Sequence, residues 1–282
     1  MSNDMKLIDL HVHSNASDGS LSPSQVADEA IRQGLCAIAL TDHDTIDGIP
    51  EILNYTEDKP LTVVPGIELS CYYNKREIHL LGFYMDYENP RLHKELDKLK
   101  QARENRNLKM IELMQADGLP ITLEKLLHGN PDSVITRAHF ARVLVEEGIC
   151  KDKNTAFKSY IGIGCKYYLP KPEVSCEHAM SILTSYSKAA FLAHPLIYHF
   201  GYTQIEDLTD YLMSLGLKGI EAYHSSNNSY ESDKLRSLAL KKGLAISGGS
   251  DFHGAVKPDI TMGKGRGGMR IPLRLLDNIQ EL

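Results

Sequence analysis

The chain has 282 residues, of which 42% are hydrophobic and 24% charged, and no apolar run nears the ~20 residues that a membrane span needs. These values exclude a disordered or membrane-spanning protein and predict a compact chain with a sizeable core. The net charge of −6 argues against a long nucleic-acid footprint such as duplex binding requires, but it allows a local basic pocket.

Cysteine usage and the start of the chain bear on the cellular compartment. The five cysteines are odd in number and contain no CxxC pair, which argues against a disulfide framework and against a thiolate zinc site. The opening stretch, MSNDMKLIDL, contains acidic residues and no long apolar core, so it lacks the pattern of a signal peptide. We therefore expect a reducing, cytoplasmic setting.

Short apolar, β-branched runs alternate with helical patterns along most of the chain. The segment SPSQVADEAIRQG has a serine cap at Ser22, a proline at the first helical position and a closing glycine at Gly34, and it predicts a crossover helix. The segments YTQIEDLTDYLMSLG and SYESDKLRSLALKKG follow the same pattern. This alternation predicts an α/β protein with a parallel sheet. The predicted strands cover residues 6–13, 36–42, 61–69, 77–84, 189–194, 217–224 and 244–249.

The pattern changes between residues 89 and 172, where no convincing strand is present. This segment opens with a long charged helix, PRLHKELDKLKQARENRNLKMIELMQADG, whose leucines and methionines recur at three- and four-residue steps and predict a packed stripe. Its lysines and arginines are predicted to form a solvated face. We therefore predict a barrel-like catalytic domain from residues 1–88 and 173–282, with residues 89–172 as a helical insertion domain that contributes to the substrate pocket.

Side chains of the metal-ligand type stand at the ends of the predicted strands. The first strand carries an HxH pair, and the segments ALTDHDT, GIELS, EIHLLG, FLAHPL and GGSDFHG add further imidazoles and carboxylates. In a parallel barrel the C-terminal strand ends converge on one rim, so these groups are expected to meet. The nine candidate metal ligands are His11, His13, Asp18, His43, Glu68, His79, His194, Asp251 and His253.

A single histidine in such a place is more often a packed or surface residue than a ligand. Taken together, however, six histidines and three carboxylates beside apolar strands would each cost kilocalories if they were buried without a common partner. Metal ions remove that cost. Imidazole and carboxylate without thiolate suit manganese, iron or zinc, and the donor mix does not choose among them. The histidines predicted to be structural or solvated are His93, His128, His139, His178 and His199.

Two aspartates lie beside these motifs without being candidate ligands. In a regular strand Asp9 shares the face of His11 and His13, so it is predicted to hydrogen-bond a ligand imidazole and orient it. Asp42 faces the other way, and a structural role and a role at the site both stay open for it.

These motifs resemble those of the polymerase and histidinol phosphatase (PHP) superfamily of metal-dependent phosphoesterases. The shared motifs are the HxH of DLHVHS, then TDHDT, a glutamate after a strand, AHP and a final DFH. The resemblance implies the PHP fold, a distorted (β/α)7 barrel, here with a helical insertion. It is closest to the stand-alone branch of nucleoside 3′,5′-bisphosphate phosphatases and 5′–3′ exoribonucleases.

The resemblance also implies a three-metal site, residue by residue. It places His11, His13, Glu68 and Asp251 on one ion, and Glu68, His79 and His194 on a second. A third ion would be held by Asp18, His43 and His253. Two or three divalent ions are thus expected, with manganese favoured and iron or zinc also compatible with the donors.

Two substrate-binding residues follow from the same resemblance. Arg137 would clamp a substrate phosphate, and His224 would sit beside the scissile phosphoryl group. There His224 would act as a general acid or donate a hydrogen bond to the phosphate, and the alternative is that His224 is only a packed histidine. The stretch CKYYLP departs from the pattern of the branch, so Lys166 and Tyr167 leave open how the rim of the pocket is built.

The favoured function is hydrolysis of the 3′-phosphate of a nucleoside 3′,5′-bisphosphate, with short 5′-phosphorylated single-stranded RNA ends as a further substrate and neither duplex nucleic acid nor membrane as a partner. A histidinol-phosphate phosphatase is the alternative within the enzymes, and it would need a pocket for an imidazole and an ammonium group. A metal-stabilised binding module without catalytic activity is the alternative from another class.

Overall fold

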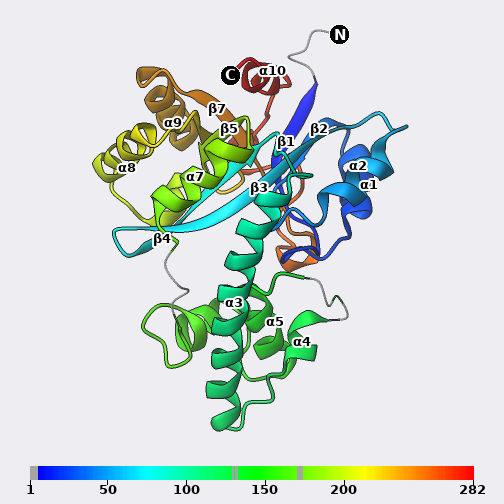
Figure 1. Ribbon diagram of the computed structural model, residues 1–282, viewed down its shortest axis with the longest axis vertical. Coiled ribbons are helices and arrows are strands. Elements are labelled where there is room, and N and C mark those ends of the chain that lie inside the picture. The colour runs from blue at the N-terminus through cyan, green and yellow to red at the C-terminus, as the bar shows by residue number, and fades with distance from the viewer. Residues whose placement is uncertain (1–5, 129, 131–132, 170–173) are drawn as a thin grey trace.

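The computed structural model describes residues 6–128, 130, 133–169 and 174–282. Its strands form one sheet of seven, and their order in the sheet follows their order in the chain. Figure 1 shows this sheet at the centre of the molecule, with helices around it and a group of helices projecting from one end. The strands are β1 (Leu7–Val12), β2 (Leu35–Leu40), β3 (Thr62–Tyr73), β4 (Arg76–Phe83), β5 (Ala189–Leu192), β6 (Gly219–His224) and β7 (Ala245–Gly249).

The sheet is parallel except at β4, which runs antiparallel to both β3 and β5. The prediction of a wholly parallel sheet is therefore wrong at this strand. β3 continues past its predicted end, and only Asn74 and Lys75 separate it from β4, which is too short a connection for a crossover helix. Both residues have positive φ, 47° and 64°, as a tight two-residue hairpin turn requires.

The sheet curls into a nearly closed barrel because the chain after β7 returns to β1. Asp251 donates its backbone N–H to the carbonyl of His11 at 2.9 Å, and His13 donates to the carbonyl of Phe252, also at 2.9 Å. Alternate strand residues, among them Ile8, Ala37 and Phe191, fill the barrel interior as one apolar cluster. The α/β fold class and the distorted seven-stranded barrel are thus confirmed.

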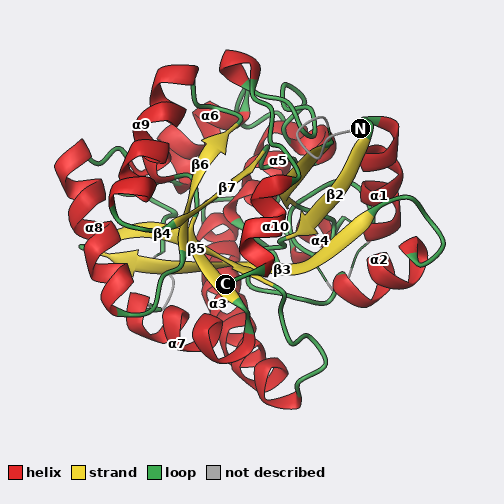
Figure 2. Ribbon diagram, turned by 90° about the horizontal axis from the view of Figure 1, so that it is seen from above, coloured by secondary structure: helices red, strands yellow, loops and turns green. Residues whose placement is uncertain are grey.

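Helices cover the outside of the barrel and close one of its ends, as seen from above in Figure 2. The predicted crossover helix is α1, with Ser22 as its capping residue and Pro23 at its start. α10 closes the end at which β1 begins, where Ile271 and Leu276 join the interior cluster. These outer helices are α1 (Pro23–Arg32), α2 (Ile49–Thr56), α7 (Cys176–Tyr186), α8 (Tyr202–Ser214), α9 (Ser229–Lys241) and α10 (Arg274–Gln280).

The helices between β4 and α7 lie at the opposite end of the barrel (Figure 1). They have an apolar core of their own, which includes Met110, Phe140 and Leu144. The long helix α3 joins both regions, because its Leu92 and Leu96 pack in a second apolar cluster, which also contains residues of β3, β4, α7 and α8. The predicted domain limits stay a prediction, and the limit at 172–173 lies outside the described residues. These helices are α3 (Pro90–Ala116), α4 (Leu123–Leu127), α5 (Arg137–Glu146) and α6 (Lys153–Ala156), followed by a π-helical turn (Phe157–Ile161).

None of the helices in the described parts of the chain is both long enough and apolar enough to cross a membrane.

Candidate functional site

The nine predicted ligand side chains lie together at the end of the barrel that faces the helical insertion. They form four overlapping groups, and in each group one nitrogen or oxygen donor atom from every residue lies within 4.8 Å of those from the other residues. Other histidines in the described part of the chain belong to none of these groups. The groups are His11, His13 and Asp251; His11, Glu68 and His194; His43, Glu68 and His79; and His13, Asp18, His43 and His253.

Glu68 lies at the centre of the site and is fully buried. Its Oε1 atom is 2.7 Å from His79 Nδ1 and 2.9 Å from His194 Nε2. Its Oε2 atom is 3.2 Å from both His11 Nε2 and His13 Nε2. Oε2 also lies 3.0 Å from His43 Nδ1, so one carboxylate oxygen faces two histidines and the other faces three. A carboxylate that bridged two ions would have its oxygens placed in this way.

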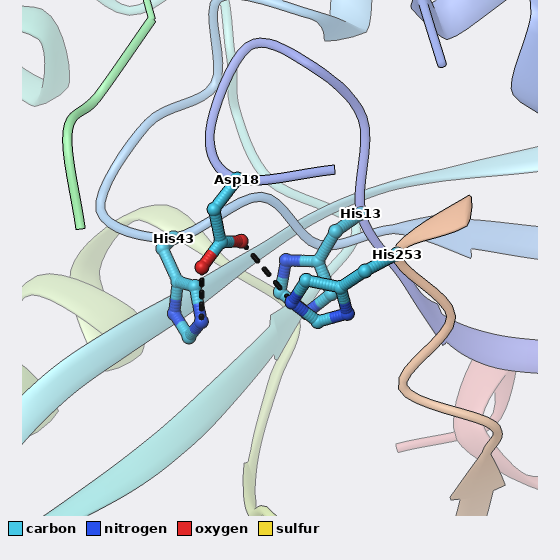
Figure 3. A group of neighbouring side chains, drawn as sticks. All are labelled: His13, Asp18, His43 and His253. Carbon is cyan, nitrogen blue, oxygen red and sulfur yellow. Dashed lines mark ion pairs between the residues drawn. The ribbon is translucent and has the colours of Figure 1, made fainter. Parts of the chain in front are cut away.

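Figure 3 shows the group of His13, Asp18, His43 and His253. Asp18 Oδ1 is 3.1 Å from His253 Nε2, and Asp18 Oδ2 is 4.0 Å from His43 Nε2. The rings of His13 and His253 stack with their centroids 4.1 Å apart. Three imidazoles thus surround one carboxylate from three different segments of the chain.

Asp42 holds the loop that carries Asp18. It accepts hydrogen bonds from the Ser14 backbone N–H at 2.8 Å, the Ser14 hydroxyl at 2.6 Å and the Ser17 hydroxyl at 2.5 Å. Asp42 is buried, and the described hydrogen-bond partners of its side chain all belong to this loop. Of the two roles that the sequence left open for Asp42, the structural one agrees with these contacts.

The antiparallel direction of β4 explains how His79 reaches the site. The parallel strands end at this rim, but β4 begins there, so His79 comes from the first half of its strand and pairs with Ser70 of β3. Sequence reasoning placed His79 at the C-terminal end of a parallel strand; it reaches the rim instead because β4 is antiparallel. Two residues of the site, His194 and Asp251, have positive φ of 21° and 57°, a strained conformation that bonds to the rest of the structure must hold.

Several of the donor atoms are buried without a hydrogen-bond partner, which fits metal binding. His13 Nε2, Asp18 Oδ1 and Glu68 Oε2 have no hydrogen-bond partner among the described residues. Burial lowers the pKa of the His43 imidazole well below its ordinary value. Burial raises the pKa of Glu68, but the nearby imidazoles outweigh it and hold this pKa well below the usual range. Both shifts favour the forms that bind a divalent ion, the neutral imidazole and the ionised carboxylate.

Glu221 supports two of these histidines, and sequence reasoning missed it. Its Oε1 atom is 3.0 Å from His11 Nδ1, and its Oε2 atom accepts the backbone N–H of His194 at 2.7 Å. Glu221 is fully buried in β6. A carboxylate within the otherwise apolar run GIEAY is a sequence signal that could have identified it.

The prediction that Asp9 orients a ligand imidazole is wrong. Its carboxylate instead accepts the Ser250 backbone N–H at 2.9 Å, the Ser250 hydroxyl at 2.5 Å, the Gly263 N–H at 2.7 Å and the His11 backbone N–H at 3.2 Å. The reason is a register shift in β1 between Asp9 and Val12, which breaks the regular alternation of faces. Asp9 therefore joins the backbone of β1 at His11 to the backbone of the segments after β7, at Ser250 and Gly263.

His224 lies at the edge of the cluster. Its Nε2 atom is 3.7 Å from Asp251 Oδ2 and has no hydrogen-bond partner among the described residues. Its Nδ1 atom accepts the backbone N–H of Ser226 at 3.2 Å, so the neutral ring carries its proton on Nε2. That proton faces the candidate metal site.

A cleft of about 160 Å³ opens beside Asp18, His43 and His79. Arg137, at the first position of α5, lines this cleft and donates to Glu77 at 2.6 Å. Arg103 and Arg106 of α3 line it as well, and only 5% of each is exposed. The prediction of a solvated face is therefore wrong for these two arginines.

Lys166 and Tyr167 are directed elsewhere. Both contact Asp117 at the end of α3, Lys166 through an ion pair and Tyr167 through a hydrogen bond of 2.5 Å. Tyr167 is buried in the core of the insertion, and neither residue is among the described residues that line the cleft.

Comparison with known proteins identifies the family of the chain. The PHP domain family matches residues 9–193. The chain is 33% identical to the 3′,5′-nucleoside bisphosphate phosphatase of Chromobacterium violaceum over 251 residues, which are 88% of each protein. It is 32% identical to a 5′–3′ exoribonuclease of Haemophilus influenzae over 250 residues, 88% of this chain and 90% of the relative.

A solved structure of an amidohydrolase from Chromobacterium violaceum, with bound sulfate and no metal, superposes with a TM-score of 0.86 at 30% identity and covers 97% of this chain and 96% of its own. The fold, the clustered donors and these relatives agree with one another. The chain therefore belongs to the PHP domain family and is a metal-dependent phosphoesterase, a hydrolase.

Proposed function

We propose that the protein removes the 3′-phosphate of a nucleoside 3′,5′-bisphosphate while the 5′-phosphate is held in the arginine-lined cleft. The observation that carries this proposal is the position of three arginines, Arg103, Arg106 and Arg137, in the cleft that also contains Asp18 and His79 of the candidate metal site. A phosphate bound by these arginines would not be the one that reacts, so the substrate needs two phosphates.

The charges in the cleft support an anionic ligand. Burial and the neighbouring Arg106 lower the pKa of Arg103 to about 9. Burial and Arg137 lower the pKa of Arg106 to about 10. Its Nε and one of its terminal nitrogens have no hydrogen-bond partner in the described structure. A phosphate dianion would reduce the mutual repulsion of these guanidinium groups and accept hydrogen bonds from Arg106.

Two or three divalent ions would be held by the groups described above, with Glu68 shared between two of them and Asp18 in the group toward the cleft. We favour manganese on the family resemblance, and imidazole with carboxylate also suits iron or zinc. Such ions supply positive charge against the phosphoryl oxygens and lower the pKa of a nearby water.

His224 would serve the leaving group. In the hydrolysis, water attacks phosphorus, the bond between phosphorus and O3′ breaks, and the alkoxide that leaves takes up a proton. The Nε2–H of His224 faces the site beside Asp251, and this position supports proton donation or a hydrogen bond to the departing oxygen. The products are inorganic phosphate and a nucleoside 5′-monophosphate.

Short single-stranded RNA with a 5′-phosphate belongs to the same proposal, because the anchor would place its first 3′ ester at the same position as the 3′-phosphate. The net charge of −6 gives little support to binding a long duplex. We also propose a cytoplasmic location, which is supported by five cysteines that form no disulfide in the described structure.

Histidinol phosphate is the competing substrate. Its ammonium group would have to enter beside three guanidinium groups, and this repulsion favours the bisphosphate. The test compares kcat/KM for adenosine 3′,5′-bisphosphate, adenosine 3′-monophosphate and histidinol phosphate with manganese supplied. We expect the bisphosphate to exceed the 3′-monophosphate by at least ~10-fold, the effect of one modest charge-assisted contact. Equal kcat/KM for the bisphosphate and the 3′-monophosphate would mean that the cleft does not bind a 5′-phosphate. Faster hydrolysis of histidinol phosphate would favour the alternative enzyme.

A further inference from the structure

Phe157 is an exposed aromatic side chain in the cleft that contains the three arginines. It is 37% exposed and lines the same cavity as Arg106 and Arg137. The other described residues around this cavity are polar or charged, apart from Ala138. An aromatic ring that faces water among charged groups leaves apolar surface that a ligand could cover.

The backbone around Phe157 directs its ring away from the core of the insertion. Ala156 before it and Ile161 after it are fully buried in that core, whereas Phe157 does not belong to it. Phe157 begins the π-helical turn that ends at Ile161. A Cβ atom at Gly162 would lie 2.1 Å from the carbonyl oxygen of Phe157, so the turn requires glycine there.

We propose that Phe157 stacks on the nucleobase of the substrate and makes the site selective for nucleotides over phosphorylated sugars without a base. This inference rests on the proposed function, since it takes the arginines to hold the 5′-phosphate. A nucleotide bound in this way would have its base close to its 5′-phosphate and thus within the same cleft. Every base has a π face, so the stacking favours nucleosides as a class and not one particular base.

A second feature of the cleft supports a bound nucleotide. The guanidinium of Arg137 lies 5.6 Å from the ring centre of Tyr168, a cation–π contact that limits where this arginine can move. Arg137 is also paired with Glu77 at 2.6 Å. The proposed phosphate-binding group is therefore held in place, while part of the Phe157 side chain stays exposed in the cleft. A fixed anchor next to an uncovered ring is suited to a ligand with a phosphate and a flat apolar part.

The first experiment measures binding without turnover. The chain contains no tryptophan, so Phe157→Trp introduces a single indole at the proposed stacking position. Adenosine 5′-monophosphate should quench its fluorescence, and ribose 5-phosphate, which has the same phosphate but no base, should not. Ile163→Trp is the matched control, because Ile163 is 71% exposed in the same insertion and does not line the cleft among the described residues. Equal quenching by both ligands, or equal quenching in both variants, would overturn the proposal.

The second experiment uses activity. Phe157→Ala should lower kcat/KM for adenosine 3′,5′-bisphosphate by about 10-fold more than for ribose 3,5-bisphosphate, since only the first substrate has a base to stack. Ile163→Ala should leave both values unchanged. Equal losses on the two substrates would mean that Phe157 has only a structural role. If the unsubstituted protein hydrolyses neither bisphosphate, the proposed function fails, and the quenching by adenosine 5′-monophosphate still decides whether a base stacks on this residue.

Discussion

Glu221 gives the sharpest test of how the site is organised, because it contacts two candidate ligands without being one. Burial raises the pKa of its carboxyl, but the neighbouring His11 outweighs burial, so this pKa lies below its ordinary value and Glu221 is ionised. Glu221→Gln keeps the shape of the side chain and removes its charge. The hydrogen bond from His11 Nδ1, now 3.0 Å long, would then lack its charged acceptor.

The expected effect follows from what these bonds do. A carboxylate that orients a metal-binding imidazole typically contributes 10- to 100-fold in metal affinity, or about 1.4 to 2.7 kcal/mol. Glu221 also accepts a hydrogen bond of 2.7 Å from the backbone N–H of His194, a residue with a strained φ of 21°. We therefore expect Glu221→Gln to weaken metal binding by ~10- to 100-fold and to lower the Tm of the metal-free protein.

Asp9→Asn is the matched control, since Asp9 is equally buried and also lies beside His11. Its carboxylate contacts backbone groups and the Ser250 hydroxyl, so its replacement should lower the Tm and change metal affinity little. The assay is competition for manganese against a chelator of known affinity, with thermal unfolding measured in parallel. A loss of metal affinity in Asp9→Asn as large as that in Glu221→Gln would refute this reasoning.

Two further substitutions test other parts of the site. Glu68→Ala should abolish phosphatase activity and lower the manganese content by more than one ion per chain, because both of its oxygens face candidate ligands; elemental analysis that finds only one ion lost would contradict the bridging role. Arg137→Ala should lower kcat/KM for adenosine 3′,5′-bisphosphate at least ~10-fold and affect an aryl phosphate less, with Arg137→Lys intermediate because it keeps the charge and loses the planar fork. Equal losses on both substrates would instead place Arg137 at the reacting phosphate.

The strands and most helices could be predicted because their signals are local. Each predicted strand range overlaps an observed strand, and capped, glycine-ended segments such as the one at Ser22 became helices. The direction of β4 could not be predicted in the same way, because the extra length of β3 up to Tyr73 hides the hairpin. Neither Asn74 nor Lys75 is a glycine, and a glycine in the turn is the strongest local sign of such a hairpin.

The clustering of the candidate donors could be predicted, because these residues belong to the sequence motifs. The roles of residues outside the motifs could not be predicted, because the surrounding structure determines them. The role of Asp9 depends on a register shift in β1, and no pattern of hydrophobic residues in that strand announces such a shift. Arg103 and Arg106 stand three residues apart and therefore share one face of α3, but charges occur all around this helix and conceal which face is buried.

The insertion also shapes the site through the loop at residues 14–18. Ser133 donates to the carbonyl of Ser17 at 2.5 Å, the N–H of Val134 to the carbonyl of Ala16 at 3.0 Å, and Thr136 to Asp18 Oδ2 at 2.8 Å.

Thr136 directly precedes Arg137, and Arg103 pairs with Asp44, the residue after His43. The phosphate anchor and two candidate ligands are therefore built on the same contacts between insertion and barrel. Because the two groups share these contacts, we expect that an anion bound in the cleft and a metal ion bound by Asp18 and His43 would influence each other's free energy of binding.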